Sequence, residues 1–433
     1  MTKVLFEDIV KKDKGMLRGP FGGDLKKEIF VEKTETTYKV YEQGVVLRRN
    51  PEIGRYHIAK EYFDNKMHRF EVLPKDFLVS CSGVNYGAIF QLGDKIEKGV
   101  INQALLRIRL DNGVIDDDYF YYLFNSLIVN MIVGRKGDST IPNFPPLSVI
   151  KKLEFELPEL NYQKLVGRTL IQIDKKIELN NKINAELEAM AKLIYDYWFV
   201  QFDFPDANGK PYKSSGGKMV YNDELKREMP ESWDVKQLSE VLTFERGISY
   251  KSKEITDEGV PMINLNSFNL NGQYKSKGLK YFSGSYKDNK IVSTGDLVIA
   301  ITDVTRNADI IGKAFTIPDL FEGDILISCD VAKVVPSELV NAQFLEPLFN
   351  SEHYHSYIKH FASGTLVLHL NLDGVNWCKI PLPPIEILNK YSELRTDIDK
   401  KLTLAIKENK KLTELRDWLL PMLMNGQVTV KDE

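Results

Sequence analysis

Two stretches of this 433-residue chain repeat one another. Residues 123–193 align without a gap on residues 348–418, at a constant offset of 225 residues. The anchors are Leu123-Phe124-Asn125-Ser126 with Leu348-Phe349-Asn350-Ser351, Leu157-Pro158 with Leu382-Pro383, and Ile173-Asp174-Lys175-Lys176 with Ile398-Asp399-Lys400-Lys401. The period is far longer than that of a solenoid, so we expect two copies of one unit. Such a molecule offers two related surfaces to a two-sided target.

Length and composition are those of a soluble globular protein. A chain of 433 residues is too long for one hydrophobic core, and the repeat sets the expected number of globules at two. Apolar residues make up 43% of the chain and charged residues 27%, which excludes wholesale disorder. The start of the chain has no apolar signal core, and no apolar run approaches the roughly 18 residues of a spanning helix. We therefore expect a cytoplasmic protein.

Charge and cysteine content exclude further classes. The net charge of −3 argues against a protein that coats nucleic acid by itself. Residues 245–290 nevertheless carry eight Lys and Arg against five acids, whereas residues 291–380 carry five against eleven, so one edge of this region suits phosphate. The three cysteines lie far apart, which supports neither a disulfide framework nor a structural zinc site.

The pattern of residues divides the chain into globules and helices. In the first globule, strands are predicted at Tyr38–Tyr41, Asp76–Ser80 and Ala104–Leu110, and a helix at Tyr119–Val133. Its segment Asp76–Ser80 matches Asp296–Ala300 at an offset of 220, so the globules diverge more than the helices do. The expected segments are a mixed α/β globule at 1–155, a spacer helix at 156–200, a linker at 201–230, a second globule at 231–380, a C-terminal spacer helix at 381–425 and a tail at 426–433.

Both segments that follow Leu-Pro show a heptad pattern, which predicts two long helices that pair with each other. One seam position of the first segment holds Val166, Ile173, Asn180, Leu187 and Ile194, and the other holds Leu170, Ile177, Asn184, Ala191 and Trp198. In the second segment these positions hold Tyr391, Ile398, Ala405, Leu412 and Leu419, and Arg395, Leu402, Asn409, Arg416 and Leu423. Asn184 and Asn409 share one seam position, where a polar residue sets the register at a cost in stability. The alternative, that both face solvent or a loop, stays open.

Candidate catalytic patterns are weak. Asp206, Glu224 and Lys226 fit the loose pattern of a magnesium-dependent nuclease, but they lie in the predicted linker, where no rigid sheet fixes metal geometry. Asn143-Phe144-Pro145-Pro146 departs from the Asn-Pro-Pro-aromatic motif of amino-methyltransferases by an extra Phe. His353, His355 and His360 cluster without a second ligand pair. We therefore expect a protein that binds and does not catalyse.

Together these features resemble the specificity (S) subunit of Type I restriction-modification systems. The motifs that carry the resemblance are the two Leu-Pro pairs, the two Ile-Asp-Lys-Lys motifs and the segment from Met229 to Leu238. Further matches are Arg18-Gly19-Pro20-Phe21-Gly22-Gly23, Arg246-Gly247 and Gly364-Thr365. The resemblance covers nearly the whole chain, and its motifs occur twice and in the expected order.

The resemblance implies two mixed α/β target-recognition domains, separated by two long antiparallel coiled-coil helices with an internal pseudo-twofold repeat. Each domain would read one half of a bipartite double-stranded DNA site. The helices would dock two modification (M) subunits, which bind S-adenosylmethionine and methylate adenine. Restriction (R) subunits, which use ATP and magnesium, are possible further partners, and no cofactor or metal is expected in this chain itself.

Polar and basic side chains on loops are the expected DNA contacts, because Arg, Asn and Gln bond to base edges and Lys to phosphate. The candidates are Arg18, Gln43, Arg48, Arg49, Asn50, Arg55, Asn85 and Tyr86 in the first globule, and Tyr250, Lys251, Asn264, Asn266, Asn269, Lys275 and Arg306 in the second. For helix pairing and M-subunit docking the candidates are Ile173, Ile177, Asn184, Leu187, Ile194, Ile398, Leu402, Asn409, Leu412 and Leu419.

Two other readings compete with DNA recognition. The first is a pseudo-dimeric coiled-coil scaffold that recruits proteins and reads no DNA. The second is a self-sufficient restriction enzyme, which requires the match of Asp206, Glu224 and Lys226 to be real.

Overall fold

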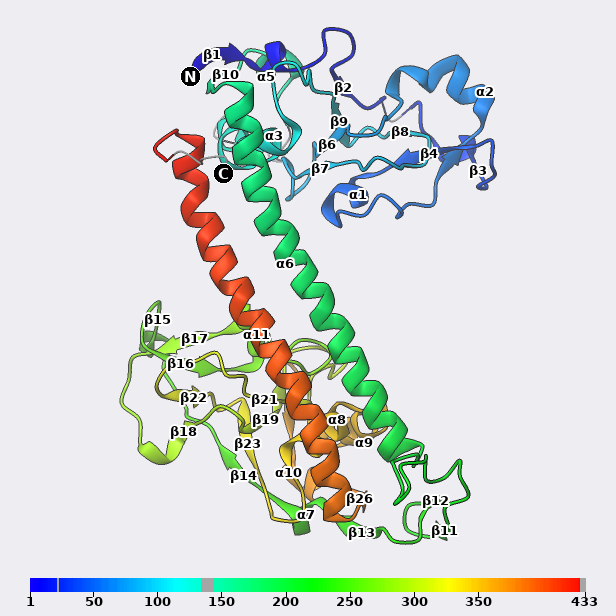
Figure 1. Ribbon diagram of the computed structural model, residues 1–433, viewed down its shortest axis with the longest axis vertical. Helices are drawn as coiled ribbons and strands as arrows, with labels where there is room; N and C mark the ends of the chain where they lie inside the picture. Colours follow the sequence, from blue (N-terminus) through cyan, green and yellow to red (C-terminus); the bar gives the residue numbers. More distant parts are fainter. Residues whose placement is uncertain (22, 134–143, 429–433) are drawn as a thin grey trace. The chain divides into compact units, whose positions relative to one another are not determined.

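The computed structural model describes residues 1–21, 23–133 and 144–428. It separates into two compact units, one formed by Met1–Ile177 with Lys411–Glu433 and the other by Glu178–Lys410. Each unit contains one globule and parts of both long helices, α6 (Leu160–Tyr195) and α11 (Ile385–Met424) (Figure 1). The mixed α/β fold class expected from the sequence is confirmed.

The first unit is built on two four-stranded sheets, of order β2-β9-β6-β7 and β3-β5-β4-β8. All pairs in the first sheet are antiparallel, whereas β4 and β8 in the second run parallel. The described strands are β1 (Thr2–Leu5), β2 (Met16–Arg18), β3 (Phe30–Val31), β4 (Tyr38–Tyr41), β5 (His57–Ile58), β6 (Phe77–Ser80), β7 (Ile89–Gln91), β8 (Gly99–Ile101), β9 (Leu105–Ile108) and β10 (Glu154–Leu157). The helices include α1 (Gln43–Leu47), α2 (Lys60–Tyr62), α3 (Asp117–Leu123), α4 (Val129–Val133) and α5 (Leu147–Ile150). The predicted strands correspond to β4, β6 and β9, and the predicted helix to α3 and α4.

The second unit repeats this plan with two sheets of order β14-β23-β19-β21 and β15-β17-β16-β22-β18. A further small sheet has the order β20-β25-β24. The described strands are β11 (Met219–Asn222), β12 (Arg227–Pro230), β13 (Asp234–Gln237), β14 (Leu242–Arg246), β15 (Ile255–Thr256), β16 (Val260–Ile263), β17 (Lys280–Phe282), β18 (Ile291–Val292), β19 (Leu297–Ala300), β20 (Thr302–Asp303), β21 (Ala314–Thr316), β22 (Ile325–Ile327), β23 (Val331–Pro336), β24 (Ala362–Ser363), β25 (Leu368–Leu370) and β26 (Lys379–Leu382). The helices include α7 (Leu238–Val241), α8 (Ala342–Asn350), α9 (Glu352–Ile358) and α10 (Leu372–Asn376).

Strand pairing shows that the two units are copies. The strand that enters each long helix, β10 or β26, pairs antiparallel with the first strand of its globule, β1 or β13. Leu157 pairs with Thr2 and Leu382 with Asp234, so the leucines of the two Leu-Pro pairs have the same place in the register. The parallel pair of β4 with β8 likewise recurs as β16 with β22. The repeat read from the sequence is thus a repeat of topology.

Gly19 and Gly247, which lie in two of the motifs that carry the family resemblance, are required by close backbone approach. A Cβ on Gly19 would collide with the backbone carbonyl of Asn102, and one on Gly247 would collide with the carbonyls of Ile327 and Ser328. Gly19 therefore allows the chain at the end of β2 to lie against Asn102, just after β8. Gly247 likewise allows the chain at the end of β14 to lie against Ile327 and Ser328, at the end of β22. Gly22, in the same motif as Gly19, lies outside the described residues.

The long helices pair antiparallel within each unit. In the first unit, the Tyr162 hydroxyl donates to the Leu423 carbonyl at 3.2 Å, and Arg416 forms an ion pair with Asp174 at 2.8 Å. In the second unit, the ring of Trp198 lies 5.9 Å from that of Tyr391. All predicted seam residues are buried or half-buried, which confirms the heptad pattern.

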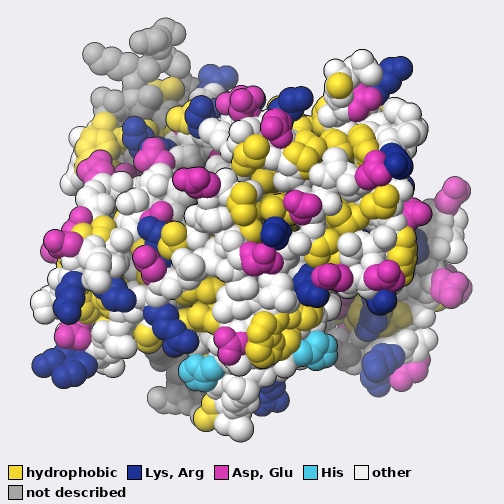
Figure 2. All heavy atoms as spheres, turned by 90° about the horizontal axis from the view of Figure 1, so that it is seen from below, with side chains coloured by type: hydrophobic (Ala, Val, Ile, Leu, Met, Phe, Trp, Pro, Cys, Tyr) yellow, Lys and Arg dark blue, Asp and Glu magenta, His cyan; other side chains and the backbone are white. Residues whose placement is uncertain are grey.

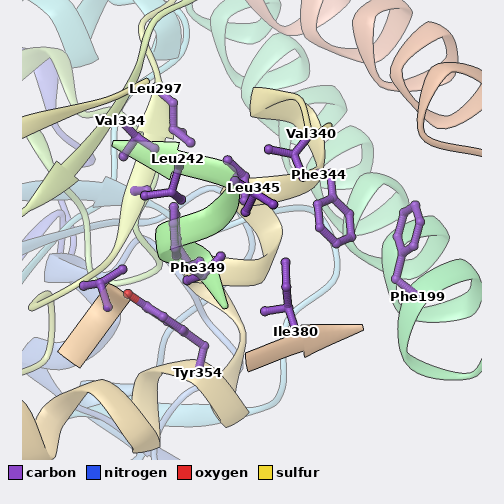
Figure 3. Packing of buried hydrophobic residues seen from close by; sticks show 14 of the residues in the cluster. Phe199, Leu242, Leu297, Val334, Val340, Phe344, Leu345, Phe349, Tyr354 and Ile380 are labelled. Atoms are coloured by element: carbon purple, nitrogen blue, oxygen red, sulfur yellow. The ribbon is translucent and has the colours of Figure 1, made fainter. Parts of the chain in front are cut away.

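The core of the second unit joins α6 to the globule. Phe199, just beyond α6, makes an edge-to-face contact with Phe344 of α8, with ring centroids 5.0 Å apart. Figure 3 shows Leu345 and Phe349 of α8 directed toward Leu242, Leu297 and Val334 of the sheet. Burial of this continuous apolar cluster fixes the globule on the helix.

Residues 201–230, for which the sequence predicted a linker, are ordered. Phe202 and Phe204 are buried in the second core, and the carboxylate of Asp203 accepts hydrogen bonds from the amide and hydroxyl of Ser214. A hairpin of β11 and β12 follows, with Met219 paired to Pro230. The linker prediction is therefore wrong in this respect: Gly and Ser supply tight turns here, and the buried aromatic side chains hold the segment in place.

Candidate nucleic-acid interface

Each unit carries a loop at the same place in its sheet. In the first unit the loop joins β6 to β7, and the Gly87 amide donates to the Ser80 carbonyl at 2.7 Å where the loop ends. In the second unit it joins β19 to β21 and includes the short strand β20, and the Gly312 amide donates to the Ala300 carbonyl at 2.9 Å. Both glycines have positive φ, 87° and 70°, a conformation that glycine adopts at little cost. We call these the β6–β7 loop and the β19–β21 loop.

Several predicted contacts of the first unit lie in or beside the β6–β7 loop. Asn85 is exposed in the loop, Tyr86 is half-buried next to it, and Arg18 is exposed at the end of β2. The charge of Arg18 acts on Cys81 at the start of the loop, although burial dominates there and raises the pKa of the thiol to about 12. These residues, which are distant in sequence, therefore share one neighbourhood.

Gln43, also predicted to read a base, braces the loop. Its Nε2 donates to the Ser80 hydroxyl and to the Ser82 carbonyl, both at 2.7 Å. Because both protons of this amide are in use, Gln43 has no free donor for a base edge. The structure thus shows Gln43 as a support of the loop, and its predicted contact with DNA stays a prediction.

Exposed polar and basic residues follow the end of α1, whose first residue, Gln43, contacts this loop. Arg48, Arg49 and Asn50 follow the last residue of the helix, and Arg49 takes a left-handed conformation with φ of 49°. The Arg49 guanidinium donates to the Tyr121 hydroxyl and lies 5.5 Å from the ring centroid. Arg55 is exposed as well and stacks on Tyr56 at 5.1 Å.

In the second unit, Arg306 is exposed on the β19–β21 loop, at a place comparable to that of Asn85. The loop is fixed by the buried carboxylate of Asp303, which accepts from the amides of Thr305, Ile310 and Ile311 at 2.7–3.0 Å. The ring of His355 also contacts the loop, with Nε2 3.0 Å from the Ala308 carbonyl oxygen.

A cluster of basic side chains that the sequence did not reveal packs against this loop. It consists of His355, Lys313 and Lys359. Burial, helped by the two lysine charges, lowers the pKa of His355 to about 4, so the neutral ring donates from Nε2. Lys313 in turn donates to the Leu270 carbonyl. Lys313 belongs to the same loop as Arg306, whereas His355 and Lys359 are about 50 residues away in sequence, so only the fold brings these two side chains to the loop.

The remaining predicted contacts of the second unit lie over the five-stranded sheet. Tyr250 accepts a hydrogen bond from Lys280 of β17 at 3.2 Å, and Lys251 is exposed beside it. The side chains of Asn266 and Lys275 are both exposed. They lie on neighbouring turns, which are joined by the hydrogen bond from the Lys275 amide to the Ser267 carbonyl. These four side chains remain accessible to a ligand.

Asn264 and Asn269 are structural instead. Asn264 is 2% exposed; its Oδ1 accepts from the Asn266 amide at 3.0 Å and its Nδ2 donates to the Gly278 carbonyl at 2.7 Å. Asn269 closes its own turn, with Oδ1 bonded to the amides of Asn271 and Gln273. Both predictions as base contacts are corrected, because these amides already satisfy the backbone.

The predicted docking residues lie in the seam between α6 and α11. Ile173, Ile177, Leu187 and Ile194 of α6, and their counterparts on α11, are buried or half-buried, so they serve helix pairing and do not form an outer docking surface. In the second unit, Asn409 donates to Asn181 and accepts from Asn180, both at 2.9 Å. Asn184 and Asn409 are both half-buried in the seam, which answers the question left open by the sequence.

An outer apolar stripe instead runs along each helix. On α6 it consists of Leu179, Met190 and Leu193, and on α11 of Leu404, Leu415 and Trp418, all exposed. Spacings of 11 and 14 residues correspond to about three and four helical turns, so the members of the α6 stripe, all in the second unit, share one face. On α11, Leu415 and Trp418 lie about one turn apart in the first unit, and Leu404 lies in the second. The two sets correspond at the offset of 225 residues. We call them the α6 stripe and the α11 stripe.

The residues of the possible nuclease pattern are engaged elsewhere. Asp206 Oδ1 accepts from the amides of Asn208 and Lys210 in a turn, and Glu224 forms an ion pair with Lys379 at 2.8 Å. Over the described ranges, no group of three His, Cys, Asp or Glu side chains is arranged to hold a metal ion. Asn143, of the other pattern, lies outside those ranges.

Surface charge is mixed on the side of the molecule shown in Figure 2. Basic and acidic side chains alternate there with hydrophobic ones, and no continuous basic area covers this face. Among the helices of the described part of the chain, none has the length and apolar character needed to cross a membrane.

Comparisons with known proteins agree on one family. The profile of the Type I restriction modification DNA specificity domain matches residues 22–189 and again 230–415. The MjaVIII specificity subunit of Methanocaldococcus jannaschii is 24% identical over 95% of this chain and 92% of its own length. The HindI specificity subunit of Haemophilus influenzae is 22% identical over 82% and 86%. The crystal structure of the S subunit from M. genitalium shares the fold, with a TM-score of 0.60 at 17% identity over 100% of this chain and 96% of that one.

Proposed function

The chain belongs to the Type I restriction-modification DNA specificity family, and we propose that each of its two units reads one half of a bipartite DNA site. The observation that carries this proposal is the pair of equivalent loops, β6–β7 and β19–β21. Their positions in the fold correspond, whereas their exposed side chains differ, with Asn85 in one and Arg306 in the other. Two readers that share a frame but differ in contacts suit a site with two unlike halves.

We further propose that the α6 and α11 stripes each dock one M subunit, which methylates adenine. Monomeric proteins rarely leave aligned apolar side chains exposed, and such patches usually mark a binding surface. Because the stripes correspond in the repeat, their two partners are expected to be alike. The specificity chain then supplies recognition, while S-adenosylmethionine, and any ATP and magnesium, bind to the partner subunits. Neutralisation of DNA phosphates by these partners fits the low net charge of the chain.

Co-expression with a separately encoded M subunit tests this function. The two proteins are expected to co-purify, and methylome sequencing of the host is expected to show N6-methyladenine at one split motif. Arg306→Ala should relax or abolish one half of that motif and leave the other intact, because the readers act separately. Co-purification without methylation of a split motif, and without protected half-sites in footprinting, would instead identify a protein-recruiting scaffold.

A further inference from the structure

A valine projects from the equivalent loop of each unit. Val84 lies four residues after the end of β6, and Val304 lies four residues after the end of β19. Their exposed fractions are 96% and 63%. The loops differ in length and in most of their sequence, yet an apolar β-branched residue occupies the same position in both.

Both valines are held outward by their loops. Val84 is a central residue of a turn closed by the Tyr86 amide and the Gly83 carbonyl at 3.2 Å, and Gln43 of α1 donates to the carbonyl of Ser82, the residue before this turn. Val304 follows Asp303, whose carboxylate fixes the loop through three backbone amides. Side chains on such braced tips lose little conformational freedom when a partner covers them.

The neighbours of both valines favour DNA as that partner. Val84 is followed by Asn85 and lies in a loop flanked by Arg18, while Val304 is followed within two residues by Arg306. Amide and guanidinium groups bond to base edges in the major groove, where thymine alone presents a methyl group. A protein partner that covers an apolar tip has no comparable need for these groups.

We propose that Val84 and Val304 each contact the C5-methyl group of a thymine, one in each half of the DNA site. This inference rests on the proposed function and adds the chemical feature that the loops read. Under the proposed function the two M subunits methylate one adenine in each half, so each half contains at least one thymine on one strand. The valines thereby discriminate thymine from cytosine at one position of each half-site.

Replacement of thymine by uracil tests the proposal, because it removes only the methyl group. DNA affinity of the complex with M subunits and S-adenosylmethionine is measured at fixed salt, with each thymine of the methylated motif replaced in turn. Uracil at one position in each half is expected to weaken binding about fourfold, the value of one buried methyl group. Val84→Ala should remove this preference in one half only, and Val304→Ala in the other.

Two exposed residues outside the loops, Val31 and Leu339, provide matched controls as alanine variants, which should retain both preferences. Specific binding that tolerates uracil at every position, or valine variants that keep the full preference, would overturn the proposal and leave the proposed function intact. Loss of M subunits from the Val84→Ala complex with an unchanged preference would also overturn it. A complex that does not prefer the split site over a scrambled one would refute the proposed function itself.

Discussion

At the scale of one residue, the strained backbone conformation of Arg49 points to a role of its side chain in DNA binding. It occupies the position after α1 at which the Asn50 amide returns to the Val45 carbonyl, where glycine is the usual residue. A non-glycine residue in this left-handed conformation costs about 1 kcal/mol. We expect Arg49→Gly to leave the free energy of unfolding of the first unit unchanged or raised by about 0.5 kcal/mol, while DNA affinity falls about tenfold. Thermal denaturation and DNA titration of the complex measure both. Lys14→Gly, at another exposed left-handed position with φ of 53°, is the control and should not affect affinity. Equal DNA affinities of the two variants would contradict a role of Arg49 in binding.

Residue types alone predicted only part of the candidate site. Asn85 and Arg306 are exposed as expected, but Gln43 bonds to Ser80 and Ser82, and Asn264 and Asn269 bond to the backbone of their own turns. An amide that caps a turn and an amide that reads a base have the same chemistry, so only the structure separates them. The basic cluster of His355, Lys313 and Lys359 was missed because Lys313 meets the other two, which are four residues apart, only through tertiary folding.

At the scale of the element, the two seam asparagines make a second prediction possible. Asn409 bonds across the seam to Asn180 and Asn181, whereas the buried Oδ1 of Asn184 finds no partner among the described residues. A buried polar atom without a partner costs about 1–3 kcal/mol. Asn184→Leu should therefore stabilise the second unit by about 1 kcal/mol, and Asn409→Leu should give a protein less stable than Asn184→Leu by more than about 1 kcal/mol. Denaturant unfolding followed by helical circular dichroism measures this difference, and equal stabilities would contradict the assigned asymmetry.

The long helices were the elements most completely predicted, because a heptad is a local pattern that survives in any packing of the pair. The segment 201–230 was the least well predicted. Its Gly, Ser and Asn residues are typical of linkers, and its order depends on Phe202 and Phe204, whose burial requires the distant core of the second unit. Local composition therefore identified the turns but not the contacts that fix them.

At the scale of the whole molecule, duplication predicts two independent docking sites. Replacing the α6 stripe with serines, at Leu179, Met190 and Leu193, should weaken the binding of one M subunit on the order of a hundredfold, since three exposed apolar side chains would no longer be buried against it. Native mass spectrometry should then show one M subunit per chain in place of two. Replacing Leu404, Leu415 and Trp418 of the α11 stripe should give the same stoichiometry, and the combined variant should retain neither partner. Because these side chains are exposed and lie outside the seam, helix pairing should be preserved, and circular dichroism checks it.

Serine at Val31, Tyr221 and Leu339, which are exposed outside both stripes, is the matched control. Two M subunits on either single-stripe variant would show that docking depends on other surfaces and that the duplicated stripes have another role.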